Sequence, residues 1–486
     1  MRLLLAVRPS EFRRRHLVAI FSRKRKGALL QLTSSAGCVY SYKINGGVVK
    51  KILILSLLLV AALAAEVIVD TAFFDIELGY TVELPDEFDT SKTYPLIVAL
   101  HGFGDRMSSY VGTARSFYPA GAIGLYPETP FPFERDDGEL GWAWYMWGTP
   151  EFHKATVEQS TRWVLSCIEL VKQNYPVDPR KVFLYGFSQG GMMTYEVGIQ
   201  YPEIFRGLLP AGGWLDVQID SLHPLDSAAL NLPIRTLHGV YDDIVNFEDG
   251  EAAITTLVEY GVPAEIMRYP CKHQITKEMV EDARDFVYCQ LNEEEPLPLP
   301  ALLWPDEGLE PAAHAELLRQ ILCVDESAAD IEAGLLELYR EEESTELREQ
   351  IIYLLGARRC IGSEALLDQI LADESEPQPL RQAAYSALIK VGTETAWQAI
   401  KGVKKLVLIK EVVPGTQADS LGLEPGDVVL SYNHKKIKVY LDLRKAIASV
   451  KPKKKDVVML ILREGRRIRI GLKPGRIGIY LEEVIR

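Results

Sequence analysis

Ser188 lies in the stretch of the chain whose residue types point most directly to chemistry. The apolar run Val182–Tyr185 leads into the pentapeptide GFSQG at 186–190, and apolar residues at helical spacing follow from Met192. A serine at a tight turn between a buried strand and a helix can present its hydroxyl at the edge of a sheet, and the glycines remove Cβ atoms that would block the turn. The pattern predicts a nucleophilic serine. A Ser-Gly turn without chemistry is the alternative, because so short a motif also arises by chance.

Two later strand ends supply a base and an acid for such a serine. The apolar stretch Pro233–Leu237 precedes Asp242 and Asp243, and Glu265–Tyr269 precedes His273. A histidine within hydrogen-bond reach takes the serine proton, while a carboxylate holds the histidine tautomer and stabilises its charged form. We predict that His273 is the base and that Asp242 is the acid, with the adjacent Asp243 as the second candidate.

Stabilising the intermediate of such a reaction requires hydrogen-bond donors for its oxyanion. The apolar run Pro95–Leu100 reads as a buried strand that ends at His101 and a glycine-containing loop. We predict that the backbone N–H groups of Phe103 and Gln189 form the oxyanion hole. We expect His101 to fix this loop, and His238 to be buried and hydrogen bonded.

An aromatic stretch at 127–147 lies between a predicted strand and a predicted helix. Loops of this length near an active site often form a binding wall or a lid. We predict that Trp142, Trp144 and Tyr145 bind the substrate. The alternative is that two or three of the rings in this stretch belong to the core.

The elements that must position these residues are short apolar strands that alternate with helical patterns, which is typical of a parallel α/β sheet. Functional groups in such sheets collect beyond the carboxyl ends of the strands. The predicted nucleophile, acid and base follow each other in the order serine, aspartate and histidine, which is the order that this architecture requires.

Five motifs carry a family resemblance: LHGFGD (100–105), WAWY (142–145), VFLYGFSQGG (182–191), HGVYDD (238–243) and KH (272–273). Together they resemble the phospholipase/carboxylesterase family of α/β-hydrolases, which includes acyl-protein thioesterases and broad-range esterases. The resemblance covers residues from about 70 to 290 and implies that the family triad falls on Ser188, Asp242 and His273. The chain departs from the family pattern after the acid, where it reads DIVN at 243–246, and in its long aromatic stretch. Both departures leave the substrate open.

Length and charge limit what the rest of the chain does. A chain of 486 residues exceeds one compact core, and two to four domains are expected. The net charge of −13 combines +11 in residues 1–51, −35 in residues 52–400 and +11 in residues 401–486. The acidic middle argues against binding of nucleic acid or of an anionic membrane by the hydrolase.

The N-terminal region resembles a secretory signal. Residues 49–64 combine a basic pair, an apolar run and an Ala-Leu-Ala cleavage site, so the mature chain is expected to begin near Ala65. We predict an exported protein, periplasmic or secreted, without a stable membrane span in the mature chain, because the apolar run is shorter than the roughly 20 residues a bilayer requires. Residues 1–48 are interpreted as spurious, from a misplaced start codon. The alternative is a genuine leader extension.

The cysteines show no metal-binding or disulfide framework. There are six, without a CxxC pair, so free buried thiols are expected, with a Cys271–Cys289 bridge as the alternative in an exported protein. We predict no metal and no cofactor.

Beyond the α/β-hydrolase domain, predicted at 66–292, the composition changes twice. Residues 293–311 are acidic and rich in proline, and are predicted to form a semi-extended linker. Residues 312–402 contain two similar helical segments, in which Leu347-Arg348 and Leu380-Arg381 occupy corresponding positions. This spacing predicts a small array that resembles HEAT-like repeats, with an ordinary helical bundle as the alternative.

Residues 405–486 resemble a PDZ domain of the bacterial type. The resemblance lies in a turn at 425–427 followed by the strand Val428–Tyr432. It also lies in the motif GRIGI at 475–479, which contains a loop bounded by two glycines. It implies a groove that captures the C-terminus of a partner protein by strand addition, with Ile477, Gly478 and Ile479 as the peptide-binding residues. The groove could equally be vestigial.

The sequence as a whole predicts an α/β-hydrolase fold, an all-α helical-repeat region and a small β-rich PDZ-like domain. The predicted function is that of an exported serine esterase that acts on small esters through an acyl-enzyme. A serine peptidase of similar fold and a non-catalytic interaction scaffold are the alternatives. A chain that ends near Asn292 is expected to keep its activity on small soluble esters, because every predicted catalytic residue precedes that point.

Overall fold

The structure is a computed structural model. It describes residues 18–24, 27–33 and 39–43 near the N-terminus, and the chain from residue 78 to residue 486 except for residues 118–120, 136–137, 216–226, 293, 306–307, 451–455 and 476. The predicted signal peptide at 49–64 and the expected mature start near Ala65 lie outside the described residues.

The described N-terminal residues form an antiparallel sheet of three strands in the order β1-β2-β3. The strands are β1 (Val18–Lys24), β2 (Gly27–Thr33) and β3 (Val39–Lys43). The interpretation of residues 1–48 as spurious or as a leader extension concerns the start of translation, and it stays a prediction.

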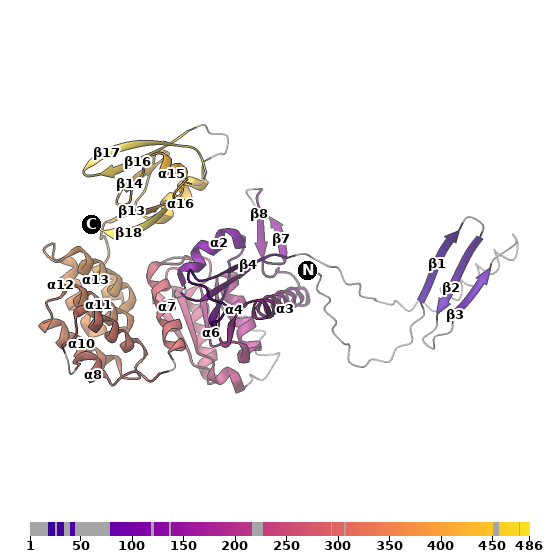
Figure 1. The fold of residues 1–486 in the computed structure, drawn as a ribbon, viewed down its shortest axis with the longest axis horizontal. Helices are drawn as coiled ribbons and strands as arrows, with labels where there is room; N and C mark the ends of the chain where they lie inside the picture. Colours follow the sequence, from indigo (N-terminus) through magenta and orange to yellow (C-terminus); the bar gives the residue numbers. More distant parts are fainter. Residues whose placement is uncertain are drawn as a thin grey trace. The chain divides into compact units, whose positions relative to one another are not determined.

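Residues 78–292 are named here the α/β domain (Figure 1). They contain a seven-stranded sheet in the order β12-β11-β10-β9-β5-β6-β4. Six strands are parallel and β4 pairs antiparallel with β6. This confirms the predicted parallel α/β sheet. The strands are β4 (Tyr80–Glu83), β5 (Tyr94–Leu100), β6 (Ile123–Pro127), β9 (Val177–Phe187), β10 (Gly207–Ala211), β11 (Ile234–Gly239) and β12 (Ala264–Tyr269).

Both faces of this sheet are buried because apolar residues follow one another without alternation along its central strands. In β5, Leu96, Val98 and Leu100 pack on one face, while Ile97 and Ala99 pack on the other. The first face is covered by α3 (Pro150–Asn174), α4 (Gln189–Gln200) and α6 (Phe247–Glu259), and the second by α2 (Met107–Ala114) and α7 (Lys277–Leu291).

Smaller elements complete the α/β domain. A two-stranded hairpin follows β6 and contains most of the aromatic stretch identified in the sequence. It is formed by β7 (Phe131–Glu134) and β8 (Leu140–Ala143). Three single turns of 3₁₀-helix are η1 (Arg115–Phe117), η2 (Pro202–Ile204) and η3 (Ser227–Asn231).

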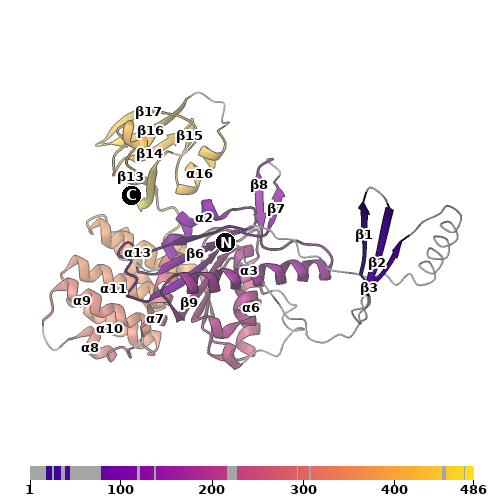
Figure 2. The same cartoon turned by 45° about the vertical axis from the view of Figure 1, so that its right-hand side comes forward.

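Residues 299–400 are named here the helical region, and within the described part of this range the chain forms helices joined by short turns (Figure 2). The predicted linker at 293–311 differs from a semi-extended chain: residues 299–303 form a short helix whose three leucines are buried, because they pack into the core of this region. The elements are α8 (Leu299–Leu303), α9 (Pro311–Leu318), η4 (Arg319–Cys323), α10 (Ala328–Glu341), α11 (Thr345–Ala357), η5 (Ile361–Ser363), α12 (Glu364–Ala372), α13 (Gln378–Val391) and α14 (Glu394–Ala399).

The helical region shares its hydrophobic core with the second face of the α/β sheet. One continuous set of buried side chains runs from Phe183 and Leu237 in the sheet, through Phe286 in α7, to Ile352 and Leu388 in α11 and α13. The two regions therefore form one packed body. The identity of the helices as HEAT-like repeats stays a prediction.

Residues 405–486, named here the C-terminal β module, form a sheet in the order β17-β16-β14-β13-β18, with β15 paired to β14. The module has a hydrophobic core of its own, centred on side chains such as Val429, Tyr432 and Met459. Its elements are β13 (Lys405–Val412), α15 (Gln417–Ser420), β14 (Val428–Tyr432), β15 (Lys435–Lys436), α16 (Tyr440–Ala448), β16 (Val457–Arg463), β17 (Arg466–Leu472) and β18 (Ile479–Ile485).

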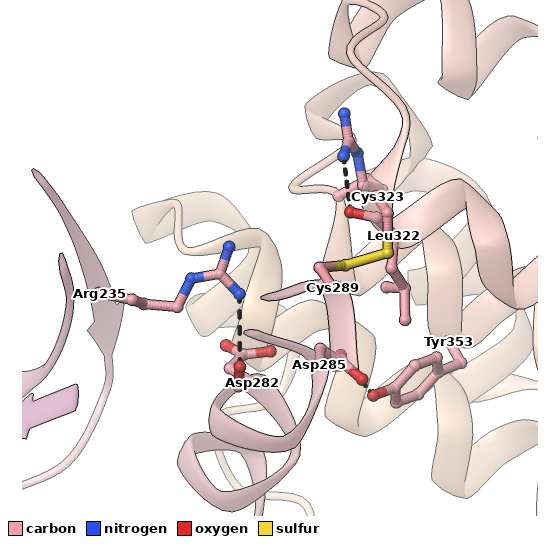
Figure 3. The surroundings of a disulfide bond; sticks show 8 residues. Arg235, Asp282, Asp285, Cys289, Leu322, Cys323 and Tyr353 are labelled. Carbon is pink, nitrogen blue, oxygen red and sulfur yellow. Dashed lines mark hydrogen bonds between the residues drawn. A yellow bond between two sulfur atoms is a disulfide. The ribbon is translucent and has the colours of Figure 1, made fainter. Parts of the chain in front are cut away.

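A disulfide joins Cys289 of α7 to Cys323 of η4, across the junction between the α/β domain and the helical region (Figure 3). The expectation of free thiols is wrong for these two cysteines, and so is the alternative Cys271–Cys289 pairing. The fold brings α7 against η4, which no cysteine spacing could reveal. Cys167, Cys271 and Cys360 are buried free thiols.

Candidate active site

Ser188 occupies a strained turn between β9 and α4. Its φ of 56° and ψ of −120° lie where residues other than glycine rarely occur. The turn needs the glycines on either side: a Cβ on Gly186 would lie 2.1 Å from the carbonyl oxygen of Gly190, and a Cβ on Gly190 would lie 2.2 Å from that of Leu100. The backbone N–H of Ser188 donates to Ala211 at the end of β10 (2.8 Å). The serine is therefore held at the carboxyl edge of the sheet.

His273 and Asp242 are brought together at the same edge, beyond β12 and β11. The His273 Nδ1 lies 2.7 Å from the Asp242 Oδ2. The other carboxylate oxygen of Asp242 accepts from the backbone N–H groups of Ile244 and Val245, each at 2.9 Å. The side chain of Asp242 is buried, so its orientation is fixed by these bonds.

The hydrogen bonds around Asp242 keep its carboxylate ionised. Burial raises the pKa of Asp242, but hydrogen bonds from His238, His273 and the backbone of Val245 and Ile244 lower it further, and the pKa lies well below its usual range. The buried carboxylate beside the His273 Nδ1 is thus placed to orient the imidazole.

Asp243 is arranged differently from its neighbour. Its side chain is exposed and forms an ion pair with the exposed Lys272, with the Lys272 Nζ 2.5 Å from the Asp243 Oδ2. A carboxylate engaged in this way at the surface does not orient His273. The geometry thus favours Asp242 over the second candidate.

Contacts around the serine place the histidine loop beside it. The ring of His273 lies 4.7 Å from the ring of Phe187, the residue before Ser188. A Cβ on Gly212 would lie 3.4 Å from the His273 Cε1, and one on Gly102 would lie 3.4 Å from the Ser188 Cβ. The ends of β5, β9, β10 and β12 therefore converge on one place.

Gln189 is the first residue of α4, where a backbone N–H has no partner within the helix. Its side chain is buried and clamps the segment after β8: the Oε1 accepts from the Trp144 backbone N–H and the Nε2 donates to the Tyr145 carbonyl oxygen, both at 2.8 Å. Gln189 thus has a fixed position in which its main chain faces the serine turn and its side chain supports the aromatic segment.

His101 and His238 are buried, as expected. The ring nitrogens of His101 lie 2.9 Å from the Gly102 carbonyl oxygen and 3.2 Å from the Glu128 Oε1, which fixes the loop that contains Phe103. The His238 Nε2 lies 3.0 Å from the Val245 carbonyl oxygen. Both imidazoles support loops at the edge of the sheet.

The predicted substrate wall needs a correction. Trp144 is fully buried and its Nε1 donates to the His101 carbonyl oxygen (2.8 Å), while Tyr145 is 5% exposed. These two rings belong to the core, because they anchor the loops around the serine rather than face a ligand. Trp142 is half-buried, and its contact with substrate stays a prediction.

Exposed rings lie instead around Phe103. The Phe103 ring stacks on Phe133 of β7, with centroids 4.4 Å apart, and meets the edge of Trp147 at 5.3 Å. Phe103 and Trp147 are 44% and 54% exposed. We name these three rings the aromatic rim. The motif pointed to Phe103 only through its backbone N–H, and neither Phe133 nor Trp147 was predicted to bind substrate, since composition does not separate Trp147 from the buried Trp144.

In the C-terminal β module, the three predicted peptide-binding residues lead into β18. Ile477 is buried and its carbonyl oxygen accepts from Ala418 (3.1 Å), while the Gly478 carbonyl oxygen accepts from Val413 (2.9 Å). Gly478 has a φ of +88°, and a Cβ there would lie 2.2 Å from the Thr416 Oγ1. Ile479 begins β18, an edge strand of the sheet.

Other kinds of site find little support in the part of the chain that the structure describes. Among these residues no group of three or more histidine, cysteine, aspartate and glutamate side chains is arranged to hold a metal ion. No helix within the described ranges has the length and apolarity required to cross a bilayer.

A parallel sheet with a serine in a strained turn and an aspartate-bound histidine at the same edge defines a serine hydrolase of the α/β-hydrolase class. The family model described as Phospholipase/Carboxylesterase matches residues 87–291. The match confirms the predicted resemblance over this part of the chain, and the chain contains a serine hydrolase.

Two curated relatives and one solved structure are similar to part of this chain. Carboxylesterase SOBER1 of Arabidopsis thaliana is 29% identical over 190 residues, which are 36% of this chain and 80% of the relative. Acyl-protein thioesterase 1 of Eremothecium gossypii is 27% identical over 142 residues, which are 28% of this chain and 57% of the relative. The crystal structure of Arabidopsis thaliana SOBER1 is 26% identical, covers 41% of this chain and 100% of its own, and has a TM-score of 0.36.

Proposed function

We propose that the α/β domain is a carboxylesterase in which Ser188 is the nucleophile, His273 the general base and Asp242 the residue that orients it. The observation that carries the proposal is the 2.7 Å contact between the His273 Nδ1 and the buried Asp242 carboxylate, at the sheet edge that also holds the strained Ser188. The matching family and the carboxylesterase relatives support the same class of reaction.

Acylation begins when the Ser188 Oγ attacks the carbonyl carbon of the ester and the His273 Nε2 takes the hydroxyl proton. The N–H groups of Gln189 and Phe103 hold the resulting oxyanion. The tetrahedral intermediate then collapses: the bond from carbon to the alcohol oxygen breaks, the alcohol leaves with the proton from His273, and the acyl group stays on the serine.

Deacylation repeats these steps with water. His273 takes a proton from water as its oxygen attacks the acyl carbon, and the proton returns to the Ser188 Oγ when the carboxylic acid leaves. Asp242 remains ionised throughout and stabilises the imidazolium of each half-reaction. The depressed pKa of Asp242 supports this role.

The substrate we propose is a small ester with an apolar group. The oxyanion donor Phe103 carries a ring that belongs to the exposed aromatic rim, so a group bound beside the scissile carbonyl would contact Phe103, Phe133 or Trp147. Two of the relatives act on esters or thioesters by their names, which supports acyl transfer without fixing the acyl chain.

Covalent labelling tests the catalytic proposal. A fluorophosphonate should label the wild-type protein at Ser188, and Ser188→Ala should lose labelling and ester hydrolysis while it keeps its fold. His273→Ala should lower kcat by a factor on the order of 10⁴, because nucleophile and base act as one unit. Asp242→Asn should be much more damaging than Asp243→Asn, and the reverse order would overturn the choice of acid.

We also propose that residues 49–64 direct export and that the mature protein works in an oxidising compartment. The Cys289–Cys323 disulfide supports this, since such bonds persist mainly outside the reducing cytosol. N-terminal sequencing of protein expressed in a bacterial host should find a chain that begins near Ala65. A product that begins at Met1 would contradict both the signal and the interpretation of residues 1–48.

For the C-terminal β module we propose a PDZ-like role in binding the C-terminus of a partner protein, and for the helical region that precedes it a HEAT-like arrangement of helices. The position of β18 at the edge of the sheet, next to the buried Ile477 and Gly478, supports strand addition along the part of β18 that precedes Ile485. Peptides with a free C-terminal carboxylate should bind more tightly than their amidated forms, and more weakly as salt is added. Equal binding of both forms, or none, would leave the module as an assembly element.

A further inference from the structure

Asp282 of α7 is the centre of a buried charge cluster between the α/β domain and the helical region. Its Oδ2 lies 2.5 Å from the Nη2 of Arg359, and its Oδ1 lies 3.2 Å from the Nζ of Lys390. Lys390 also lies 2.9 Å from the Oε2 of Glu281. Both cations come from the helical region and reach the α/β domain, where the carboxylates lie.

The two central side chains of this cluster meet almost no water, while Arg359 and Glu281 are partly exposed. The side chains of Lys390 and Asp282 are 1% and 4% exposed. Burial lowers the pKa of Lys390, but the charges of Asp282 and Glu281 raise it more strongly, and the pKa of Asp282 is lowered by Arg359 and Lys390 in spite of its burial. Both groups are therefore ionised, and each depends on the other for compensation of its charge.

On the side of the active site, the cluster holds Tyr269. The Tyr269 hydroxyl donates to the Asp282 Oδ2 at 2.5 Å. Tyr269 is the last residue of β12, four positions before His273, and its ring is fully buried. The cluster thus holds the end of β12, the strand that precedes His273 in the chain.

The main chain of Tyr269 also connects the charge cluster to the loop that leads to Asp242. Its carbonyl oxygen accepts from the N–H of Val240, in the loop that leads to Asp242, and from the N–H of Cys271 (2.8 Å each). The carbonyl oxygen of Cys271 in turn accepts from the N–H of Tyr241 (3.0 Å). The loops of acid and base are therefore joined to each other through the end of β12.

Figure 3 shows how α7 faces both sides of this junction. Arg235 of β11 donates to the Asp282 carbonyl oxygen (3.3 Å), and the Tyr353 hydroxyl of α11 donates to the Asp285 Oδ2 (2.6 Å). Together with the Cys289–Cys323 disulfide, these bonds join α7 to β11 on one side and to the helical region on the other.

We infer that Arg359 and Lys390 are positioning residues for the acid–base pair, acting through Asp282 and Tyr269. The helical region is then part of the catalytic unit rather than a spacer beside it. The inference rests on the proposed roles of His273 and Asp242. An error of about 1 Å in the position of a catalytic group costs a factor on the order of 10² in rate, so a small movement of β12 is enough to be measured.

The test uses full-length variants that remove one link at a time. Tyr269→Phe removes only the hydroxyl, Lys390→Met removes a buried charge at similar length, and Arg359→Met and Arg359→Lys form a loss-and-rescue pair. Arg348→Met is the matched control: Arg348 contacts Tyr339 (2.5 Å) and Glu376 (3.0 Å) in a similar ion cluster that lies wholly within the helical region.

Steady-state kinetics with p-nitrophenyl acetate, per active site titrated with fluorophosphonate, separates positioning from general damage. We expect Tyr269→Phe, Lys390→Met and Arg359→Met to lower kcat by about 10-fold or more with little change in KM, and Arg359→Lys to restore much of it. Arg348→Met should keep the kcat of the wild type. Equal kcat in Tyr269→Phe and the wild type would overturn the inference.

A second readout does not depend on ester turnover. The proton shared by the His273 Nδ1 and Asp242 should give a low-field NMR resonance, assigned by its loss in His273→Ala. We expect the resonance to shift or vanish in Tyr269→Phe and Lys390→Met and to stay unchanged in Arg348→Met. An unchanged resonance in all three would overturn the inference even if the wild type proved inactive on esters, a result that by itself would contradict only the proposed function.

Discussion

The helical region contacts the α/β domain on one side and the C-terminal β module on the other, and the two junctions are held by different interactions. With the α/β domain it shares one hydrophobic core, a buried ion cluster around Asp282 and a disulfide. With the C-terminal β module, whose core is separate except for Ile485, it has a smaller junction. The Ile485 side chain packs into the core of the helical region, and the Lys405 Nζ lies 4.9 Å from the Tyr385 ring centroid. The Gln378 Nε2 donates to the Ile485 carbonyl oxygen (2.6 Å), and the Ile485 N–H donates to the Gln382 Oε1 (2.9 Å).

This difference shows which boundary separates independent parts. A buried charge loses its compensation when its partner is removed, at a cost of about 3–5 kcal/mol, whereas a neutral hydrogen bond contributes about 1 kcal/mol. The first junction therefore couples folding and geometry across it. The second rests on two neutral hydrogen bonds, one cation–π contact and the side chain of Ile485, so its opening should cost less. The predicted domain boundary near residue 292 divides the sequence but not the packed body.

Truncation gives the largest expected contrast. Ending the chain at Asn292 should lower kcat per titrated site by at least about 10-fold and reduce the soluble yield, because it exposes the shared core and removes Arg359 and Lys390. Ending it at Gly402 should leave kcat within about twofold, since only the second junction is lost. This reverses the expectation from sequence, and equal activity of both truncated proteins would restore it.

Removing the disulfide should have the next largest effect. Cys289→Ser combined with Cys323→Ser opens a loop with a sequence separation of 34 residues, and the free energy of unfolding should fall by about 2–4 kcal/mol. Denaturant titration of the double variant measures this. A similar change at Cys167, which is buried and free, provides the comparison for loss of packing alone.

The ion cluster around Asp282 should make the free energy of unfolding depend on pH in the acidic range. The pKa of Asp282 is lower in the folded chain than in the unfolded one, so its contribution is complete above about pH 4 and is lost as the pH falls through the folded value. Between about pH 4 and pH 3 the advantage of the wild type over Asp282→Asn should shrink by about 1 kcal/mol. Unfolding curves at both pH values test this, and a constant difference would contradict it.

The second junction should show the smallest effect. Gln378→Ala with Gln382→Ala removes both bonds to Ile485, and the free energy of unfolding should fall by less than about 2 kcal/mol, with no change in kcat. A loss of esterase activity in this variant would mean that the C-terminal β module also helps to position the active site, and the contrast between the junctions would disappear.

Local patterns were sufficient to predict the elements that carry the chemistry. The buried strand expected at Pro95–Leu100 is found as β5 (Tyr94–Leu100), and Val428–Tyr432 is a strand with the predicted bounds. The catalytic candidates could be selected because strand, turn and helix follow each other closely around Ser188. Asp242 and His273, far from it in the chain, were selected because each follows a predicted strand, because their chain order fits, and because they match the family motifs.

What the sequence could not provide depends on contacts between distant segments. Trp144 and Trp147 stand three residues apart in one aromatic run, yet one is fully buried and the other is exposed. The pairing of Cys289 with Cys323 needs α7 to pack against η4, and the burial of Lys390 needs carboxylates from another region. Neither spacing nor composition contains this information.

The sheet of the C-terminal β module has two edge strands, β17 and β18. Their properties determine whether the protein associates with itself at high concentration. Strands at sheet edges can pair with the edges of other molecules. The edge at β17 carries the exposed Arg466, Arg467 and Arg469, so two such edges repel each other, and at the edge of β18 the amides of Gln378 and Gln382 already occupy the N–H and C=O of Ile485. Self-association through this sheet is therefore blocked by charge at one end and restricted to the short stretch before Ile485 at the other.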